Sequence, residues 1–348
     1  MNYFDILNNK LIFIDELYPI DLAYGKMGLC IYLYYLSRWE ENDEYRQVAD
    51  RLLDEVIANM PNMRDISVEN GLAGIGLGLS HLVKEEFLGG DINIILEEVD
   101  SEIFKSIAFA ETEGTYLSKP MLLQLIYYFY LRHTELKSSD HKYLYQELII
   151  KMIEMTHQNQ RSDFFQEQSS FSIQNYNTPL FLFVFSKIFE LNVYNQRLTK
   201  IIEEYMSQIL SSIPYLHANR LFLLYGLLCI KTYLPDYQNK IIEHAELLIN
   251  RIDIEYIMNF EFKNQDIYIK DGLSFVYILL YLIQKNFPDY GIAFNPQSIY
   301  KRIKNSDAWS ALINRDYYLY LRKGLYDGFM GSNLVMLHIN RHFKNYEV

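Results

Sequence analysis

The segment "IKDGLSFVYILLYL" at residues 269–282 reads as the opening of a helix, because Asp271 is a preferred N-cap residue and an unbroken apolar run follows Gly272. Similar openings occur as "LAYGKMGLCIYLYYL" at 22–36, "VENGLAGIGLGLSHLV" at 68–83 and "LYDGFMGSNLVMLHI" at 325–339. A glycine-led apolar helix that recurs along a chain indicates repetition of one structural unit.

Three further apolar segments begin near Pro120, Pro179 and Arg220, so that seven such segments follow one another at intervals of about fifty residues, enough for two helices and their loops. Helices with apolar residues on one face are predicted between them, over 43–60, 92–110, 141–158, 195–213 and 238–252. This alternation predicts an all-α fold, an α/α toroid of seven inner and about seven outer helices, as a single domain over residues 1–348. An open solenoid needs polar terminal repeats, and the last segment here is as apolar as the others.

The composition excludes some classes of protein. Half of the 348 residues are hydrophobic, and the net charge is −12 without a run of Lys or Arg, which disfavours a nucleic-acid-binding surface. Cys30 and Cys229 lie in apolar stretches and are predicted to be buried thiols in a reducing compartment. The N-terminus lacks a signal-peptide pattern and no apolar run reaches the roughly 18 residues of a membrane span. We therefore expect a cytoplasmic protein.

Paired glycines open three of the repeats, three residues apart on one face of the first helical turn. The pairs are Gly25 and Gly28, Gly71 and Gly74, and Gly328 and Gly331. We expect them to allow close packing of backbones, with Asp271 and Asp327 as helix caps.

In a toroid, the N-terminal ends of the inner helices meet at one mouth, where partial positive charge and free N–H groups favour an anionic or electron-rich ligand. The side chains predicted to line this mouth are Tyr24, Asn70, Tyr176, His217, Arg220, Lys270, Asp271, Tyr326 and Asp327.

The motifs "GKMGLCIYL", "GLAGIGLGLSHL", "DGLSFV" and "DGFMGSNL" resemble those of the lanthionine synthetase C-like (LanC-like) family, and the resemblance covers essentially the whole chain. It implies an α/α toroid. Active members of the family bind zinc through two cysteines and a histidine. The metal activates a peptide cysteine thiol, which adds to dehydroalanine or dehydrobutyrine to form a thioether ring.

The sequence departs from the family at these positions. The Cys-His-Gly opening of the sixth unit is matched by Lys270, Asp271 and Gly272, and the fifth unit's Trp-Cys-Tyr-Gly stretch by "PYLHANRLF", with His217 as the nearest potential ligand. The fourth unit's His-Gly-x-Pro-Gly is matched by residues 176–180, which begin with Tyr176. A lysine in a ligand position opposes a bound dication. We therefore predict no metal and no cofactor.

Three hypotheses on function remain. The first is a zinc-free peptide- or protein-binding accessory of thioether-type peptide modification, whose 31 tyrosines suit recognition. The alternative is a carbohydrate-active enzyme of the toroid class that uses cavity carboxylates, Asp271 and Asp327. The third is an activity dependent on Lys270, with Asp271 and His217 as an acid–base group. The sequence does not choose the ligand or the oligomeric state.

Overall fold

The computed structural model describes residues 18–112, 117–136, 139–158, 165–263 and 266–343. The N-terminal stretch that lacks a signal-peptide pattern lies largely outside these ranges. The described residues form helices and loops without a strand, as the sequence predicted. None of their helices combines the length and the apolar character that a membrane span requires.

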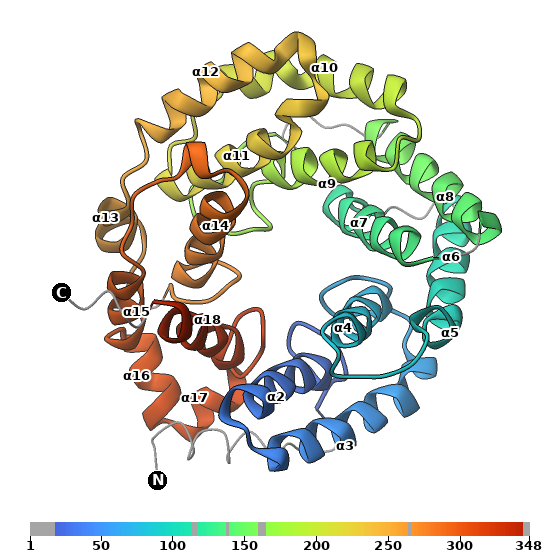
Figure 1. Cartoon of the computed structure of the whole chain (residues 1–348), viewed down its shortest axis with the longest axis vertical. Coiled ribbons are helices and arrows are strands. Elements are labelled where there is room, and N and C mark those ends of the chain that lie inside the picture. The colour runs from blue at the N-terminus through green and yellow to red at the C-terminus, as the bar shows by residue number, and fades with distance from the viewer. Residues whose placement is uncertain (1–17, 113–116, 137–138, 159–164, 264–265, 344–348) are drawn as a thin grey trace. The chain divides into compact units, whose positions relative to one another are not determined.

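Each of the seven apolar segments is a helix, which confirms the repeat pattern (Figure 1). These helices are α2 (Lys26–Glu40), α4 (Leu72–Lys84), α7 (Lys119–Glu135), α9 (Thr178–Glu190), α11 (His217–Ile230), α14 (Leu273–Asn286) and α18 (Phe329–His342). The start of α11 was predicted near Arg220 and lies three residues earlier, at His217.

The amphipathic segments are also helical: α3 (Asp43–Asn59), α6 (Glu97–Thr112), α8 (Ser139–Gln158), α10 (Asn195–Ser211) and α12 (Gln238–Ile249). The helix predicted over 92–110 is divided at the buried Leu96 into α5 (Ile92–Ile95) and α6. The remaining elements, which the sequence did not predict, are α13 (Ile254–Tyr256), α15 (Pro296–Lys304), α16 (Asp307–Asn314), α17 (Asp316–Leu321), the π-helix η4 (Ile257–Glu261), and the 3₁₀ turns η1 (Met60–Asn62), η2 (Lys231–Tyr233), η3 (Pro235–Tyr237) and η5 (Pro288–Tyr290).

The chain divides into two compact units. Unit 1 comprises residues 1–117 and 304–342. Within it α2 packs against α3, α4 and α18, and the Asn333 Nδ2 of α18 donates a hydrogen bond of 2.7 Å to the Tyr32 hydroxyl of α2. The apolar helices α2, α4 and α18 form one layer, and α3 and α6 cover α2 and α4 (Figure 1). Burial is complete for Met27 and Leu33, since α2 is covered on most sides.

Unit 2 comprises residues 118–303 and 343–348. Its apolar helices α7, α9, α11 and α14 pack in sequence order, each against the next, and α8, α10 and α12 cover them (Figure 1). The approach of α11 to α9 is close, because a Cβ on Gly226 would lie 2.9 Å from the Pro179 backbone. Glycine at this position therefore sets the spacing of the two helices.

Candidate functional site

The four glycine-led helices begin with the same backbone arrangement. The first helical residue donates its N–H to the carbonyl seven residues earlier, at 2.8 Å for Lys26 to Pro19, 2.9 Å for Leu72 to Asp65, 3.1 Å for Leu273 to Asp266 and 2.8 Å for Phe329 to Arg322. The preceding loop thus folds back over the helix start. We call this loop the strap.

The close approach of the strap explains why these helices begin after a glycine. A Cβ on Gly25, Gly71, Gly272 or Gly328 would lie between 2.3 and 2.6 Å from backbone atoms of the strap, closer than real Cβ atoms approach. The predicted close backbone packing is confirmed, although the backbone that packs there belongs to the same repeat.

Two expectations about the helix starts are wrong. Gly272, rather than Asp271, occupies the N-cap position of α14, and no side chain caps it. The N–H groups of Leu273 and Ser274 bond to the carbonyls of Asp266 and Ile267, so they are not free for an anionic ligand. The strap carbonyls satisfy donors that would otherwise be open to a ligand.

In unit 1 the straps of α2, α4 and α18 are joined by backbone hydrogen bonds. Ala23 N–H donates to the Glu69 carbonyl and Tyr326 N–H donates to the Ala23 carbonyl, both at 3.1 Å. The predicted residues Tyr24 and Tyr326 are consequently neighbours, with ring centroids 6.4 Å apart in an edge-on arrangement.

The aspartates near Tyr24 and Tyr326 accept hydrogen bonds from neighbouring residues. Asp327 Oδ2 accepts a hydrogen bond of 2.9 Å from Arg322, and the buried Asp21 accepts the Tyr24 N–H at 2.7 Å. Burial, followed by the charge of Asp327, raises the pKa of Tyr24 to about 12, so the phenol stays neutral. The side chain of Asn70 is exposed, and its backbone N–H donates to Ser67 Oγ.

In unit 2 Lys270 and Asp271 line a pocket of about 600 Å³. The strap of α14 meets the loop before α9, where Ile173 N–H donates to the Lys270 carbonyl at 3.0 Å. Other lining groups include the hydroxyls of Ser169, Ser170 and Ser172, the amides of Gln174 and Asn175, and the carboxylates of Glu261 and Asp266. The ammonium of Lys270 has no ion pair among the described residues.

Besides the strap of α14 and the loop before α9, the start of α11 borders this pocket. Two carboxylates fix it by accepting hydrogen bonds. Glu261 accepts the N–H groups of His217 and Ala218 at 2.5 and 3.0 Å. Glu167 accepts the Tyr215 N–H and, at 2.8 Å, the Asn219 amide. These glutamates lie far from α11 in sequence, which is why the predicted start was three residues late.

His217 lies beside the pocket with its Nδ1 in a hydrogen bond. Its Nδ1 accepts the Asp253 N–H at 3.0 Å, and its ring stacks on Tyr256 with centroids 4.7 Å apart. Burial, followed by the charge of Arg220, lowers the pKa of this imidazole. The neutral ring then carries its proton on Nε2. In this arrangement neither nitrogen offers a lone pair to a metal or a substrate proton.

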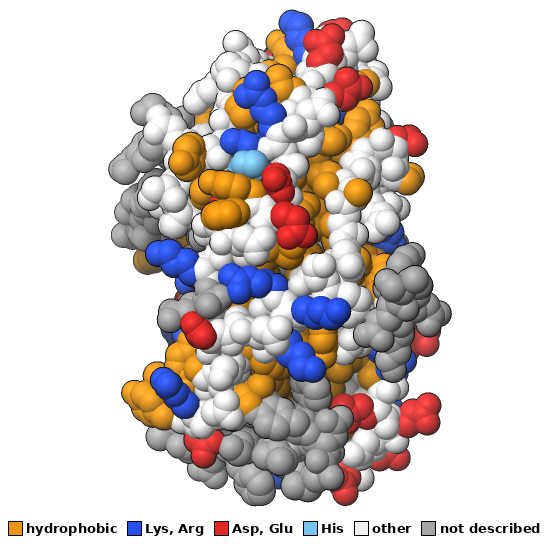
Figure 2. Space-filling model, turned by 90° about the vertical axis from the view of Figure 1, so that its left-hand side faces the viewer, with side chains coloured by type: hydrophobic (Ala, Val, Ile, Leu, Met, Phe, Trp, Pro, Cys, Tyr) orange, Lys and Arg blue, Asp and Glu red, His pale blue; other side chains and the backbone are white. Residues whose placement is uncertain are grey.

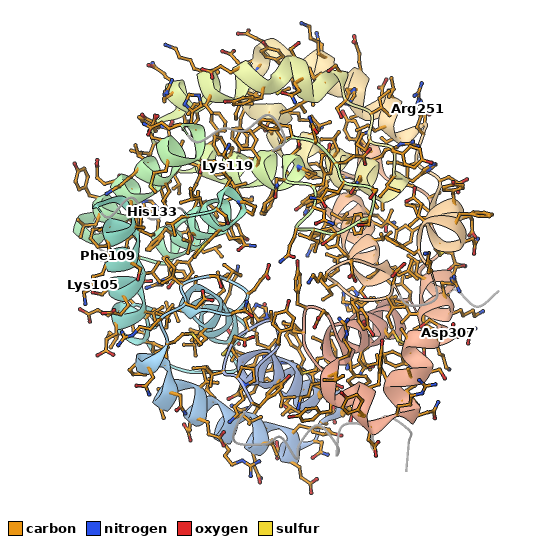
Figure 3. The ribbon with its side chains drawn as sticks, turned by 180° about the vertical axis from the view of Figure 1, so that it is seen from behind. Lys105, Phe109, Lys119, His133, Arg251 and Asp307 are labelled. Carbon is orange, nitrogen blue, oxygen red and sulfur yellow. The ribbon has the colours of Figure 1, made fainter. Side chains whose placement is uncertain are left out.

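Arg220 and Tyr176 lie outside the pocket of Lys270 and Asp271. The guanidinium of Arg220 donates to the carbonyls of Pro214, Arg251 and Tyr215 at 2.7, 2.6 and 3.0 Å, and Figure 3 marks Arg251 just beyond the end of α12. Tyr176 is buried, which raises the pKa of its phenol, and it lines a different cavity of about 400 Å³ with Glu167. Neither side chain lines the pocket of Lys270 and Asp271.

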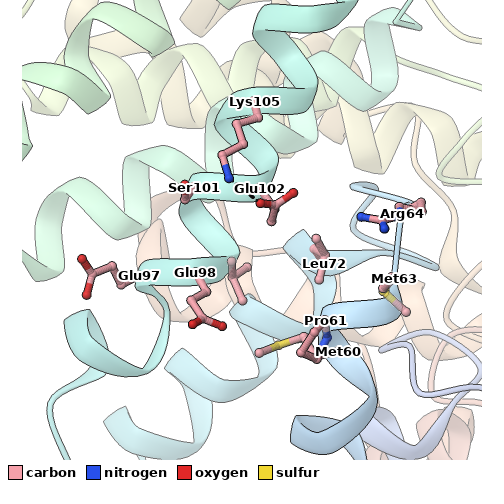
Figure 4. Close-up of a pocket in the computed structure, with 11 residues that line it drawn as sticks. Met60, Pro61, Met63, Arg64, Leu72, Glu97, Glu98, Ser101, Glu102 and Lys105 are labelled. Atoms are coloured by element: carbon pink, nitrogen blue, oxygen red, sulfur yellow. Dashed lines mark hydrogen bonds and ion pairs between the residues drawn. The ribbon is translucent and has the colours of Figure 1, made fainter.

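A cavity of about 670 Å³ in unit 1 was not predicted (Figure 4). It lies beside the start of α4, with Met60, Met63 and Leu72 in its wall and the acidic first turns of α6 at its rim. Lys105 forms an ion pair with Glu102 there. None of the residues predicted from the sequence lines it.

The residues at the positions matched to the family's zinc ligands do not fit that metal. Lysine is not a usual zinc ligand, the Nδ1 of His217 already accepts the Asp253 N–H, and no described residues form a group of three His, Cys, Asp or Glu side chains able to hold a metal ion. Cys30 and Cys229 are free thiols inside α2 and α11, and burial raises the pKa of both. Neither thiol belongs to a group of three potential metal ligands among the described residues.

The comparisons with known proteins agree with this fold. Residues 16–176 match the family model described as lanthionine synthetase C-like protein. Among solved structures, the chain is similar to one titled nisin cyclase, with 14% sequence identity and a TM-score of 0.61 over 99% of this chain and 94% of that one. No curated protein matches the chain in sequence.

At 14% identity the structural likeness shows the fold, which is the α/α toroid of nisin cyclase, and leaves the activity open. The family match covers the first three repeats and the loop before α9, including the glycine-led starts of α2 and α4. Residues 16–176 are thus similar to the lanthionine synthetase C-like family, and the chain has the fold of nisin cyclase along its length.

Proposed function

We propose that this protein binds a peptide in the pocket of Lys270 and Asp271, as a zinc-independent accessory of lanthionine-type or other thioether-type peptide modification. The observation that carries the proposal is the pocket itself. It is built from the starts of three repeats, where the family has its metal ligands, and it presents a lysine without an ion pair in place of a metal site.

The chemistry of the lining suits a polypeptide. The exposed side chains of Ser169, Ser170 and Gln174 match the donors and acceptors of a peptide backbone, and the Lys270 ammonium matches an acidic side chain. The free cysteines suit a reducing compartment such as the cytoplasm.

Lys270→Glu tests the proposal. A linear peptide selected from a synthetic library on the wild-type protein is titrated into both proteins, with binding followed by fluorescence polarisation. We expect a loss of at least tenfold in affinity, about 1.4 kcal/mol, because the pocket then presents an anion to the peptide. Lys285→Glu, at the opposite end of α14, is the matched control and leaves the affinity unchanged.

A cyclase assay completes the test. A peptide that contains a dehydroalanine and a cysteine is incubated with the protein and zinc, and free thiol is measured, since ring closure consumes it. We expect the thiol to persist. Thioether formation, or equal binding of the peptide to Lys270→Glu, would contradict the proposal.

A further inference from the structure

Two aromatic side chains beside the pocket are exposed to solvent. Tyr256 is 42% and Phe260 is 74% exposed, and their rings are stacked with centroids 5.1 Å apart. The His217 ring stacks on Tyr256 in turn. Figure 2 views the face that carries α13 and shows a histidine against hydrophobic side chains, with acidic side chains next to them. We call Tyr256 and Phe260 the aromatic pair.

A π-helical turn places this pair. Phe262 N–H donates to the Ile257 carbonyl at 3.0 Å, a bond that spans five residues. The turn buries Ile257 and Phe262 and brings Glu261 to the start of α11, while Phe260 remains outside. Such turns occur frequently at functional sites. The exposed position of Phe260 thus results from a specific backbone feature.

Carboxylates lie close to the aromatic pair in sequence. Glu255 and Asp253 are exposed carboxylates next to Tyr256 in sequence, and Asn259 donates to Glu255 Oε2 at 3.3 Å. Among the described residues, the second carboxylate oxygen of Glu255 has no hydrogen-bond donor. Arg220, a neighbouring cation, has its guanidinium turned to three backbone carbonyls. The chain as a whole carries a net charge of −12, which favours the approach of cationic partners.

We propose that the aromatic pair and Glu255 form a docking site for an arginine side chain of a partner polypeptide. A guanidinium stacks on an aromatic face and pairs with a carboxylate through the same planar group. Lysine, a compact and strongly hydrated cation, does this less well. The site borders the pocket of Lys270 through Glu261 and Leu216 but uses none of the residues on which the proposed function depends.

The test uses the full chain and three blocked peptides of the form acetyl-Gly-X-Gly-X-Gly-amide, in which X is arginine, lysine or citrulline. Binding is measured by saturation-transfer NMR on the peptide. We expect the arginine peptide to bind about fivefold more tightly than the lysine peptide, and the uncharged citrulline peptide to bind most weakly. Phe260→Ser and Glu255→Gln should each reduce arginine-peptide binding severalfold.

Phe109→Ser is the matched control, because Phe109 is 63% exposed on α6 of unit 1 (Figure 3) and its loss should leave binding unchanged. Lys270→Glu should not weaken arginine-peptide binding, which separates this site from the pocket. Equal binding of the arginine and citrulline peptides, or wild-type binding by Phe260→Ser, would overturn the proposal. Binding of a maltooligosaccharide to the aromatic pair without binding of the arginine peptide would assign the pair to a carbohydrate and overturn it as well.

Discussion

At the glycine-led helix starts, the strap backbone packs so closely on the glycine that an added methyl group would collide with it. At Gly71 an added Cβ would lie 2.5 Å from the Asp65 carbonyl oxygen and from the Ser67 nitrogen. Both are backbone atoms of the strap, and the strap is held by the Leu72 N–H. The collision is therefore relieved only by moving the strap or the helix.

Gly71→Ala should lower the free energy of unfolding by roughly 1–3 kcal/mol, as overpacking of a tight site does. Gly89→Ala is the control, because its Cβ would meet no atom within 4 Å, and its effect should stay within about 0.5 kcal/mol. Urea unfolding followed by circular dichroism measures both. Equal stability of the two variants would show that the strap does not require glycine.

Sequence reasoning at this scale found the glycines and most of the residues near the helix starts, but not their partners. Asp271 was predicted to cap α14, while the N–H groups of Leu273 and Ser274 are taken by carbonyls. Carbonyls are present in every residue, so a cap made of backbone leaves no mark in the amino-acid pattern. In the sequence, such a backbone cap is indicated only by the glycine that allows the strap to approach.

At the scale of the element, α11 shows how a helix start is fixed from a distance. Its segment "PYLHANRLF" contains no glycine and no side-chain cap of its own. The carboxylate of Glu261, from η4, replaces them by accepting two N–H groups. A negative charge at this end also complements the helix dipole.

Glu261→Gln should lower the free energy of unfolding by about 1 kcal/mol, because the amide accepts from one N–H group and lacks the charge. Glu243→Gln, an exposed glutamate on α12, is the control and should be close to neutral. Thermal unfolding followed by circular dichroism compares the two. A Glu261→Gln variant as stable as the control would contradict the assigned role of this carboxylate.

The elements themselves were largely predictable. Apolar runs gave all seven apolar helices, six of them near a glycine or proline and one near Arg220, since burial on most sides leaves a continuous apolar stretch. The π-helix η4 and the short helices α15 to α17 were missed, because segments of this length carry too few turns for a periodic pattern. The aromatic pair, which lies on α13 and η4, was missed for the same reason.

At the scale of the whole molecule, the repeat spacing and the likeness to nisin cyclase give the same fold. The sequence could not predict which residues share a pocket. Lys270 and Asp271 line one pocket, Tyr176 lines another, and Tyr24 and Tyr326 are neighbours in unit 1. The pairing of Asp271 with Asp327 in the carbohydrate hypothesis stays a prediction, because these residues belong to different units.

We propose that the pocket lined by Lys270 and Asp271 is built for a peptide and not for a metal. The most direct test is the metal content of the full chain, purified without a histidine tag and dialysed against zinc before excess metal is removed. Mass spectrometry of the metals should find zinc far below one ion per chain, and Lys270→Ala should not change that value. One zinc ion retained per chain would contradict the account.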